Sequence, residues 1–213
     1  MNIDKKYYQE INENLTNTIQ DTNISAPNKK VGKVRDAYFL NDKVVMISTD
    51  RQSAFDRVLA AIPYKGAVLN SVSAWWFKKT EHLFPNHLIS TPDPNVSIVE
   101  KCTVFPVEFV VRGYITGTTD TSLWTVYNNG DREYCGNSLP EGLKKNDKLD
   151  KPMLTPTTKD KVHDRPVSRE EIIDLGLMSA EDYDLAAKMS LDLFAFGQET
   201  AKKNGLILVD TKY

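Results

Sequence analysis

The sequence predicts an α+β fold with mainly antiparallel sheets, divided into two lobes. A hairpin pattern lies near the start, two strand patterns follow a helical segment, and helices then precede a last strand pattern. Strands and helices that are grouped, rather than strictly alternating, favour this class. The weakest join between strand patterns falls at Thr103–Pro106. We therefore expect an N-terminal lobe of residues 1–103 and a C-terminal lobe of residues 104–213.

The composition is that of an ordinary globular protein, with 213 residues, 40% hydrophobic and 26% charged. The net charge of −2 gives no indication of a nucleic-acid partner. No apolar run approaches the roughly 20 residues that cross a bilayer, so no membrane partner is expected. The start, MNIDKKYYQEINENL, has acids and amides where a signal peptide has an apolar core. We predict a cytoplasmic protein in which Cys102 and Cys135 are free thiols.

The first hundred residues suggest a helix, a hairpin and a second helix. Apolar spacing predicts a helix over residues 4–20. Residues 33–40 and 43–49 are strand patterns joined by Asn41-Asp42, a favourable two-residue turn, and the polar loop TDRQSAFD follows. The stretch GAVLNSVSAWWFKKTEHLFP predicts an amphipathic helix stopped before Pro85. The tryptophan pair in this helix is expected in the core rather than as a base-stacking platform.

The next segments are strand patterns, VSIVEKCTV and PVEFVVRGYITG. Alternation in the second places two sets of side chains on opposite faces: Val107, Phe109, Val111 and Ile115 against Glu108, Val110, Arg112 and Tyr114. A short helix in DTSLWTVYNN is expected to end with Gly130 at the C′ position. Residues 138–167 are the longest irregular segment, and a loop of this length is usually functional or mobile.

Helices dominate the last part of the chain. Ser168 and Glu171 form a capping-box pattern before a helix at 169–175, which Gly176 ends. A long helix is expected from Ser179 to about residue 204. The chain finishes on LILVDTKY, a strand pattern with Asp210 and Lys212 on one face.

The pentapeptide Gly32-Lys33-Val34-Arg35-Asp36 is the first candidate binding element. Lys33 and Arg35, two residues apart on a strand, would share a face and could converge on phosphate oxygens. The glycine would let backbone N–H groups approach closely. The alternative is an ordinary strand start with solvated charges.

A second polar cluster lies in the following loop: Asp50, Arg51, Ser53, Asp56 and Arg57. It could contact a substrate beside the phosphate-binding element, or it could simply be a solvated loop.

A third cluster combines Arg112 with the helix that starts near Ser122. An arginine on an otherwise apolar strand is unfavourable unless it is paired or faces water, so the two could bind an anion such as a phosphate monoester. The alternative is an Arg112–Glu108 pair. Asp210 and Lys212 could hold Mg²⁺ and a phosphate or carboxylate, or they could belong to a frayed terminal strand.

Six motifs occur in the same order as in a known family: GKVRDAYFL, STDRQSAFD, FPVEFVVRGYITGTTDTSLW, LPEGL with KL and TPTTK, HDRPVS, and GLILVDTKY. From about Ala26 to Tyr213 the chain resembles the SAICAR synthetases (phosphoribosylaminoimidazole-succinocarboxamide synthases), in their longer, yeast-like branch.

The resemblance implies the two-lobed SAICAR-synthetase-like variant of the ATP-grasp fold. It also implies an ATP-dependent ligase that uses Mg²⁺ in de novo purine synthesis. Such enzymes join carboxyaminoimidazole ribotide (CAIR) to L-aspartate through an acyl phosphate, which gives SAICAR, ADP and phosphate. The implied cofactors are ATP and Mg²⁺, and the implied partners are these small molecules; the oligomeric state is not implied.

The resemblance also assigns roles residue by residue. Lys33, Asp210 and Lys212 are the implied catalytic residues, and Asp210 is the implied metal ligand. The implied ATP-binding residues are Gly32, Lys33, Val34, Arg35, Lys101, Val104 and Glu108. The implied substrate-binding residues are Asp50, Ser53, Asp56, Arg112 and Ser122.

Family members continue after LVDTKY with an E-F-G segment, a further metal-binding acid and a D-S-S-R-[FY]-W motif. This sequence ends at Tyr213, so the expectation is a truncated chain with little activity alone. Two alternative functions remain at this point: a small-molecule kinase on a related fold, and a non-catalytic nucleotide-binding module.

Overall fold

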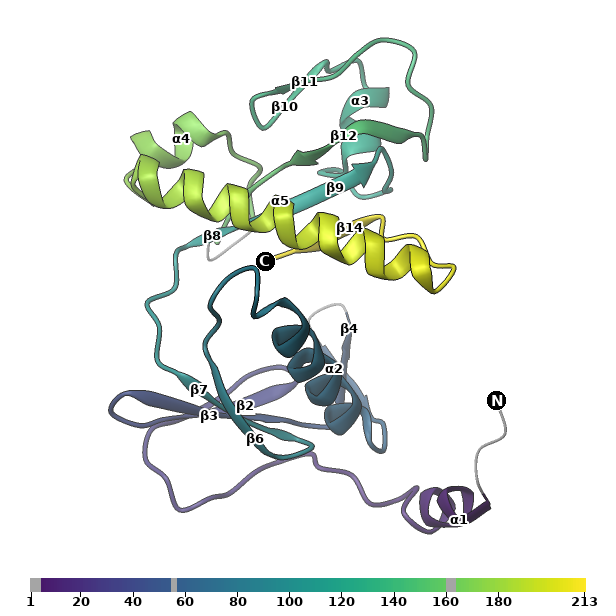
Figure 1. Cartoon of the computed structure of the whole chain (residues 1–213), viewed down its shortest axis with the longest axis vertical. Coiled ribbons are helices and arrows are strands. Elements are labelled where there is room, and N and C mark those ends of the chain that lie inside the picture. The colour runs from purple at the N-terminus through teal and green to yellow at the C-terminus, as the bar shows by residue number, and fades with distance from the viewer. Residues whose placement is uncertain (1–4, 55–56, 160–163) are drawn as a thin grey trace. The chain divides into compact units, whose positions relative to one another are not determined.

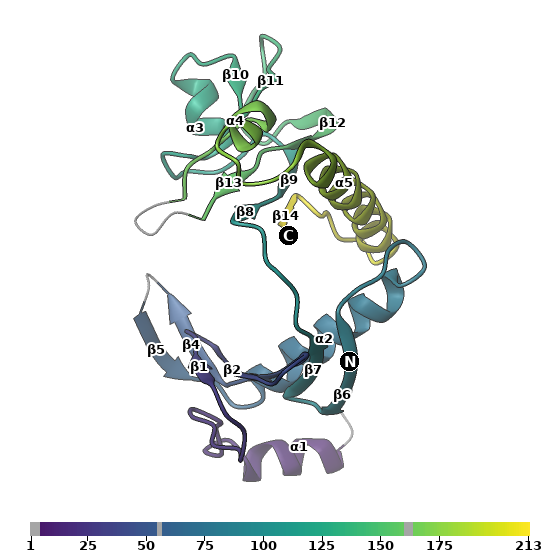
Figure 2. The same ribbon diagram turned by 90° about the vertical axis from the view of Figure 1, so that its left-hand side faces the viewer.

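The computed structural model describes residues 5–54, 57–159 and 164–213. The chain divides into two compact units, residues 1–103 and residues 104–213, and each is described by itself (Figures 1 and 2). We call them the N-terminal unit and the C-terminal unit.

The N-terminal unit is built on a five-stranded antiparallel sheet with the order β1-β2-β3-β7-β6. Its strands are β1 (Lys29–Val31), β2 (Arg35–Phe39), β3 (Lys43–Ser48), β6 (Leu88–Asp93) and β7 (Val96–Glu100). A separate hairpin is formed by β4 (Arg51–Ala54) and β5 (Arg57–Ala61), and the helices are α1 (Lys5–Glu13) and α2 (Lys65–Thr80). Helix α2 packs on the sheet at β3 and β7 (Figure 1).

The predicted hairpin is confirmed. Strands β2 and β3 pair from Arg35↔Ser48 to Phe39↔Val44. The N–H of Leu40 donates to the Lys43 carbonyl at 2.9 Å, which closes the two-residue turn at Asn41-Asp42. Short-range turn chemistry therefore fixes the register of β2 and the central strand β3.

Several predictions for this unit are wrong. Helix α1 ends at Glu13 instead of extending to residue 20. Farther along the chain, the Ile19 N–H donates to the Asp50 carboxylate and the Gln20 carbonyl accepts from Arg51. Lys33 lies before strand β2 rather than on it, so it and Arg35 do not share a strand face. The predicted polar loop contains strand β4 and leads into β5, and strand β6 was not predicted.

Helix α2 presents a different face to the sheet from the one that its apolar residues predict. Gly66 and Asn70 are its buried residues, whereas Trp75 is 44% exposed, which corrects the core assignment of that side chain. A Cβ on Gly66 would lie 2.2 Å from the Ser48 carbonyl oxygen. The helix therefore approaches the sheet so closely at this point that only a glycine fits, and its apolar residues Val68, Val72 and Trp75 are exposed.

The C-terminal unit is centred on a three-stranded sheet with the order β12-β9-β14. The elements are β8 (Val107–Glu108), β9 (Val110–Tyr114), α3 (Leu123–Asn128), β10 (Glu133–Tyr134), β11 (Asn137–Ser138), β12 (Lys148–Leu154), β13 (Thr157–Thr158), α4 (Arg169–Asp174), α5 (Ala180–Lys203) and β14 (Asp210–Lys212). Helix α5 packs against β9 and β12. Two apolar clusters fill this unit, one around Phe109 and Ile172 and the other around Ile115 and Leu123.

The capping predictions in this unit are confirmed. Ser168 and Glu171 form the capping box of α4. Ser179 caps α5 by accepting from the Asp182 N–H. The segment 138–167, by contrast, is not one irregular loop. It contributes β12, which pairs with β9, and β13, which pairs with β8, because long-range pairing with a central strand overrides its loop-like composition.

Candidate functional site

The GKVRD segment forms the tight turn of the β1–β2 hairpin. The Gly32 N–H donates to the Arg35 carbonyl at 2.8 Å, which leaves Lys33 and Val34 at the tip. A Cβ on Gly32 would lie 2.8 Å from the same carbonyl oxygen, so the closeness of the turn depends on glycine. We call residues 32–35 the hairpin turn.

Arg51 supports the hairpin turn from its buried side. Its Nη2 donates to the Gly32 carbonyl at 3.0 Å and its Nε to the Lys33 carbonyl at 3.1 Å. Its Nη1 donates to the Gln20 carbonyl at 2.5 Å, so the same guanidinium also holds the chain segment that precedes β1. Thr49 completes this support, because its N–H and its Oγ1 both donate to the Val34 carbonyl, at 3.0 and 2.8 Å.

Asp36 is the charge partner of Arg51. Its side chain is fully buried, and Arg51 Nη2 lies 2.6 Å from Asp36 Oδ1. Thr22 Oγ1 donates to Asp36 Oδ2 at 2.7 Å, and Lys29 Nζ lies 3.3 Å from the same oxygen. Burial by itself would raise the pKa of Asp36, but hydrogen bonds from Arg51, Thr22 and Lys29 outweigh it and hold the pKa below its usual range.

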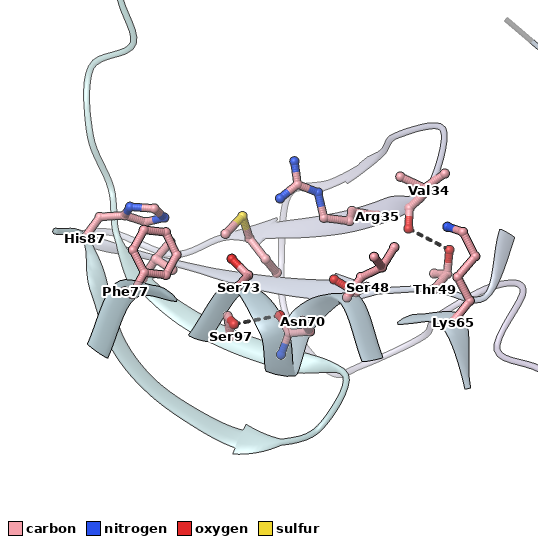
Figure 3. A pocket seen from close by; sticks show the side chains of 13 residues that line it. Val34, Arg35, Ser48, Thr49, Lys65, Asn70, Ser73, Phe77, His87 and Ser97 are labelled. Atoms are coloured by element: carbon pink, nitrogen blue, oxygen red, sulfur yellow. Dashed lines mark hydrogen bonds between the residues drawn. The ribbon is translucent and has the colours of Figure 1, made fainter. Parts of the chain in front are cut away.

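A pocket of about 290 Å³ lies between the sheet and α2, next to the hairpin turn (Figure 3). Val34 and Arg35 of the turn line it, together with Lys65 at the start of α2. Figure 3 shows Lys65 beside Thr49 at one end and the ring of His87 beside that of Phe77 at the other. The side chains of Arg35 and Lys65 give the lining of the pocket a positive charge, which favours an anionic ligand.

Sequence reasoning missed three residues that line this pocket. His87 contacts Phe77 edge to face at 5.1 Å, and burial, with a smaller effect of Arg35, lowers its pKa. Asn70 accepts from Ser97 Oγ at 2.8 Å and so ties α2 to β7. Lys65 is the third. A polar residue on a predicted amphipathic helix was the available signal for Asn70, whereas nothing local marked His87.

The second predicted cluster divides into separate environments. Asp50 is buried, and its two oxygens accept from the Ile19 N–H at 2.8 Å and the Gly66 N–H at 2.9 Å. Ser53 lies on β4 opposite Val58 of β5. Asp56 lies outside the described residues. Asp50 therefore joins the N-terminal segment to the start of α2, which places the helix beside the pocket.

Arg112 in the C-terminal unit lies next to the last strand. Asp210 pairs with it across β9 and β14, and Arg112 Nη1 lies 3.9 Å from Asp210 Oδ2. Arg112 Nε also donates to Thr155 Oγ1 at 2.9 Å. Arg112 thus contacts Thr155 and Asp210, whereas the alternative interpretation paired it with Glu108.

Glu108 lies between two lysines. Lys212 Nζ is 2.6 Å from Glu108 Oε2, and Lys159 forms an ion pair with Glu108 Oε1. Burial would raise the pKa of Glu108, but the two ammonium groups outweigh it and lower the pKa. Two candidate residues, Glu108 and Lys212, are thus brought together in one cluster, to which Lys159 of the TPTTK motif adds a second cation.

The remaining predicted residues are more scattered. Ser122 is buried and shares a hydrogen bond of 2.8 Å with Thr125 Oγ1. The Lys101 N–H donates to the Asp42 carbonyl at 2.9 Å, and Val104 is exposed. Among the described residues, no group of three or more His, Cys, Asp or Glu side chains converges as a metal site would require.

The comparisons with known proteins agree with one another. The model of the SAICAR synthetase family matches residues 28–213. The phosphoribosylaminoimidazole-succinocarboxamide synthase of Legionella pneumophila (strain Lens) is 58% identical over 195 residues, which cover 92% of this chain and 62% of the relative. The chloroplastic synthase of Arabidopsis thaliana is 57% identical over 208 residues, or 95% of this chain and 51% of the relative.

Solved structures give the same result. The SAICAR synthase of Saccharomyces cerevisiae complexed with SAICAR superposes with a TM-score of 0.77 at 29% identity, covering 91% of this chain and 70% of that one. A SAICAR synthetase (Type-2) in complex with ADP superposes with a TM-score of 0.70 at 25% identity, covering 87% and 73%. The α+β architecture with its antiparallel sheets is therefore the fold of the SAICAR synthetases. The chain belongs to the SAICAR synthetase family.

Two further facts bound this assignment. The chain spans about 62% of the length of the Legionella relative that it matches. No helix within the described ranges is both long and apolar enough to cross a membrane.

Proposed function

We propose that this chain acts in the ATP-dependent ligation of CAIR and L-aspartate, a step of purine biosynthesis. The products are SAICAR, ADP and phosphate. Membership of the SAICAR synthetase family over residues 28–213 is the observation that carries this proposal. A relative solved with ADP and another solved with SAICAR support the ligand classes.

The hairpin turn is the proposed site for the ATP phosphates. Lys33 and Arg35 supply positive charge from the turn, and Gly32 lets the backbone come close to the phosphate oxygens. Lys65, which lines the adjoining pocket with Arg35, adds a third cation. We assign the adenine to Lys101 and Val104, and we include Glu108 among the ATP-binding residues.

The ribotide and the aspartate are assigned to the remaining polar groups. Arg112 and Ser122 would bind the ribotide, with the guanidinium facing its phosphate. Asp50, Ser53 and Asp56 would form the substrate segment, in which Asp50 acts by holding the start of α2 through Gly66.

The proposed chemistry has two steps. A carboxylate oxygen of CAIR attacks the γ-phosphorus of ATP, and ADP leaves. The aspartate amine then attacks the acyl carbon, loses a proton, and phosphate leaves. Lys33 and Lys212 stabilise the negative charge that develops on transferred oxygens, so catalysis rests mainly on positioning and electrostatics.

Mg²⁺ is the proposed metal, and Asp210 is its proposed protein ligand. The Asp210 side chain is 51% exposed, and a hard oxygen donor suits Mg²⁺, which is usually held by one or two carboxylates together with substrate phosphates. When bound, the ion would neutralise phosphate charge. The described residues fit such a substrate-borne ion rather than a cage made of protein alone.

Titration calorimetry tests the binding part of the proposal. The chain should bind ATP, and Lys33→Ala and Arg35→Ala should each weaken binding about 10-fold, because each removes a charge-assisted contact. Lys202→Ala, at the exposed end of α5, is the matched control and should leave the affinity unchanged. Unaltered affinity in both turn variants would return the pentapeptide to an ordinary solvated hairpin.

A coupled assay tests the reaction itself. ADP formation should require CAIR and aspartate together, and SAICAR should accumulate in equal amount. ADP release that continues undiminished without aspartate would instead identify a kinase.

A further inference from the structure

Arg51 makes contacts that the proposed chemistry does not use. Its guanidinium is nearly buried, and three of its donors reach the carbonyls of Gln20, Gly32 and Lys33. A fourth contact joins it to Asp36. A planar fork with five donors can satisfy such a set, whereas a lysine ammonium cannot.

The direction of the carbonyls in the hairpin turn is the key observation. The carbonyls of Gly32 and Lys33 point to Arg51, and the carbonyl of Val34 points to Thr49. The peptide bonds of the turn are planar and trans, since the described residues contain no cis bond. In each of them the N–H of the next residue therefore points the opposite way from the carbonyl. The N–H groups of Lys33, Val34 and Arg35 are therefore directed away from Arg51 and Thr49.

Successive backbone N–H groups that are not turned toward a buried support can act together as an anion receptor, as they do in phosphate-binding loops. We propose that Arg51 is a positioning residue which, with Thr49, orients the hairpin turn so that these three amides face a nucleotide phosphate. Arg51 itself touches no phosphate. Asp36 neutralises its buried charge and fixes the orientation of the guanidinium.

This inference rests on the proposed nucleotide site and assigns backbone groups and one buried side chain to it. It leads to a specific expectation: the effect of Arg51 depends on the number of phosphates in the ligand. A residue that only stabilises the fold would change the affinities for adenosine and ATP equally.

The test measures the affinities of adenosine, AMP, ADP and ATP for the full chain and for Arg51→Lys. The lysine keeps a positive charge beside Asp36 but cannot hold both turn carbonyls. We expect ATP binding to weaken about 10-fold and adenosine binding to change less than about 2-fold. Arg169→Lys, an exposed arginine that pairs with Asp184 through both oxygens, is the matched control and should change neither.

Amide NMR signals give a second readout. ATP should shift the amide protons of Lys33, Val34 and Arg35 downfield in the wild type, and these shifts should be lost in Arg51→Lys. If Arg51→Lys fails to fold, Thr49→Val replaces it, since this change removes only the Oγ1 bond to Val34 and should reduce the ATP preference about 3-fold.

The possible outcomes distinguish the positioning role of Arg51 from the phosphate site itself. A folded Arg51→Lys with an unchanged ratio of ATP to adenosine affinity overturns the positioning role and leaves the nucleotide site in place. A wild type that binds ATP no better than adenosine overturns the phosphate site and the inference together.

Discussion

Arg51 Nη2 and Asp36 Oδ1 lie 2.6 Å apart, in a pair that is buried directly behind the hairpin turn. The pair joins the first residue of β4 to strand β2, which follows the turn. Because both charges are desolvated, each depends on the other to remain stable in the interior. Asp36, which lies next to Lys33 and Arg35 in the sequence, thus faces the buried side of the turn and not the proposed phosphate site.

Asp36→Asn should destabilise the chain by about 3 kcal/mol at pH 7, because Arg51 loses its charge partner. Urea unfolding would measure the loss. Asp192→Asn, which removes an exposed pair with Lys188 on α5, is the control and should change stability by less than about 0.5 kcal/mol. Equal effects of the two substitutions would contradict a special role for the buried pair.

The same aspartate should make stability sensitive to acid. Its folded-state pKa is below the usual 3.8, so its contribution is fully present above pH 3.8 and is lost as the pH falls through the lower folded value. Unfolding free energies measured from pH 6 to pH 2.5 should therefore fall more steeply in the wild type than in Asp36→Asn. Parallel curves would show that Asp36 has the same pKa in the folded and unfolded chains.

Gly32→Ala should weaken ATP binding about 10-fold with little change in the fold elsewhere. The new Cβ would lie 2.8 Å from the Arg35 carbonyl oxygen, so the backbone of the turn must move. Gly197→Ala is a useful comparison, because its Cβ would meet only the flexible end of Leu208, at 2.8 Å. Calorimetry with ATP should separate the two, and equal affinities would show that the turn tolerates a side chain.

Gly66→Ala should destabilise the N-terminal unit by about 2 kcal/mol, since overpacking at a fixed backbone contact cannot be relieved by a rotamer change. The contact is the 2.2 Å approach to the Ser48 carbonyl oxygen. Thermal unfolding measures this change. Preserved stability would mean that α2 can lift from the sheet, and the pocket volume would then differ from the one described.

The ion pair between Glu108 and Lys212 should contribute only modestly to the free energy of unfolding. A double-mutant cycle with Glu108→Gln and Lys212→Met should give a coupling energy of about 0.5–1 kcal/mol, because Lys212 is 54% exposed and its charge is screened. The coupling should fade as the pH falls below the usual 4.5 and through the lower folded pKa of Glu108. Zero coupling at pH 7 would show that Lys212 does not help to hold Glu108, which would then rely on Lys159 alone.

The sequence by itself determined the features that depend on neighbours along the chain. Asn41-Asp42 predicts its turn, and Ser168 with Glu171 predicts the start of α4, because the bonds involved join residues only a few positions apart. The ordered motifs likewise identified the family and placed GKVRD among the candidate binding residues.

Only the tertiary structure decided which residues act on that segment. Arg51 donates hydrogen bonds to the carbonyls of Gly32 and Lys33, far back in the sequence. Strand β12 forms inside a segment of loop-like composition and pairs with β9. Gly66 determines which face of α2 meets the sheet. Each of these depends on burial and on hydrogen bonds between distant positions. Local composition carries no record of the partner, so these contacts appear only when the chain folds.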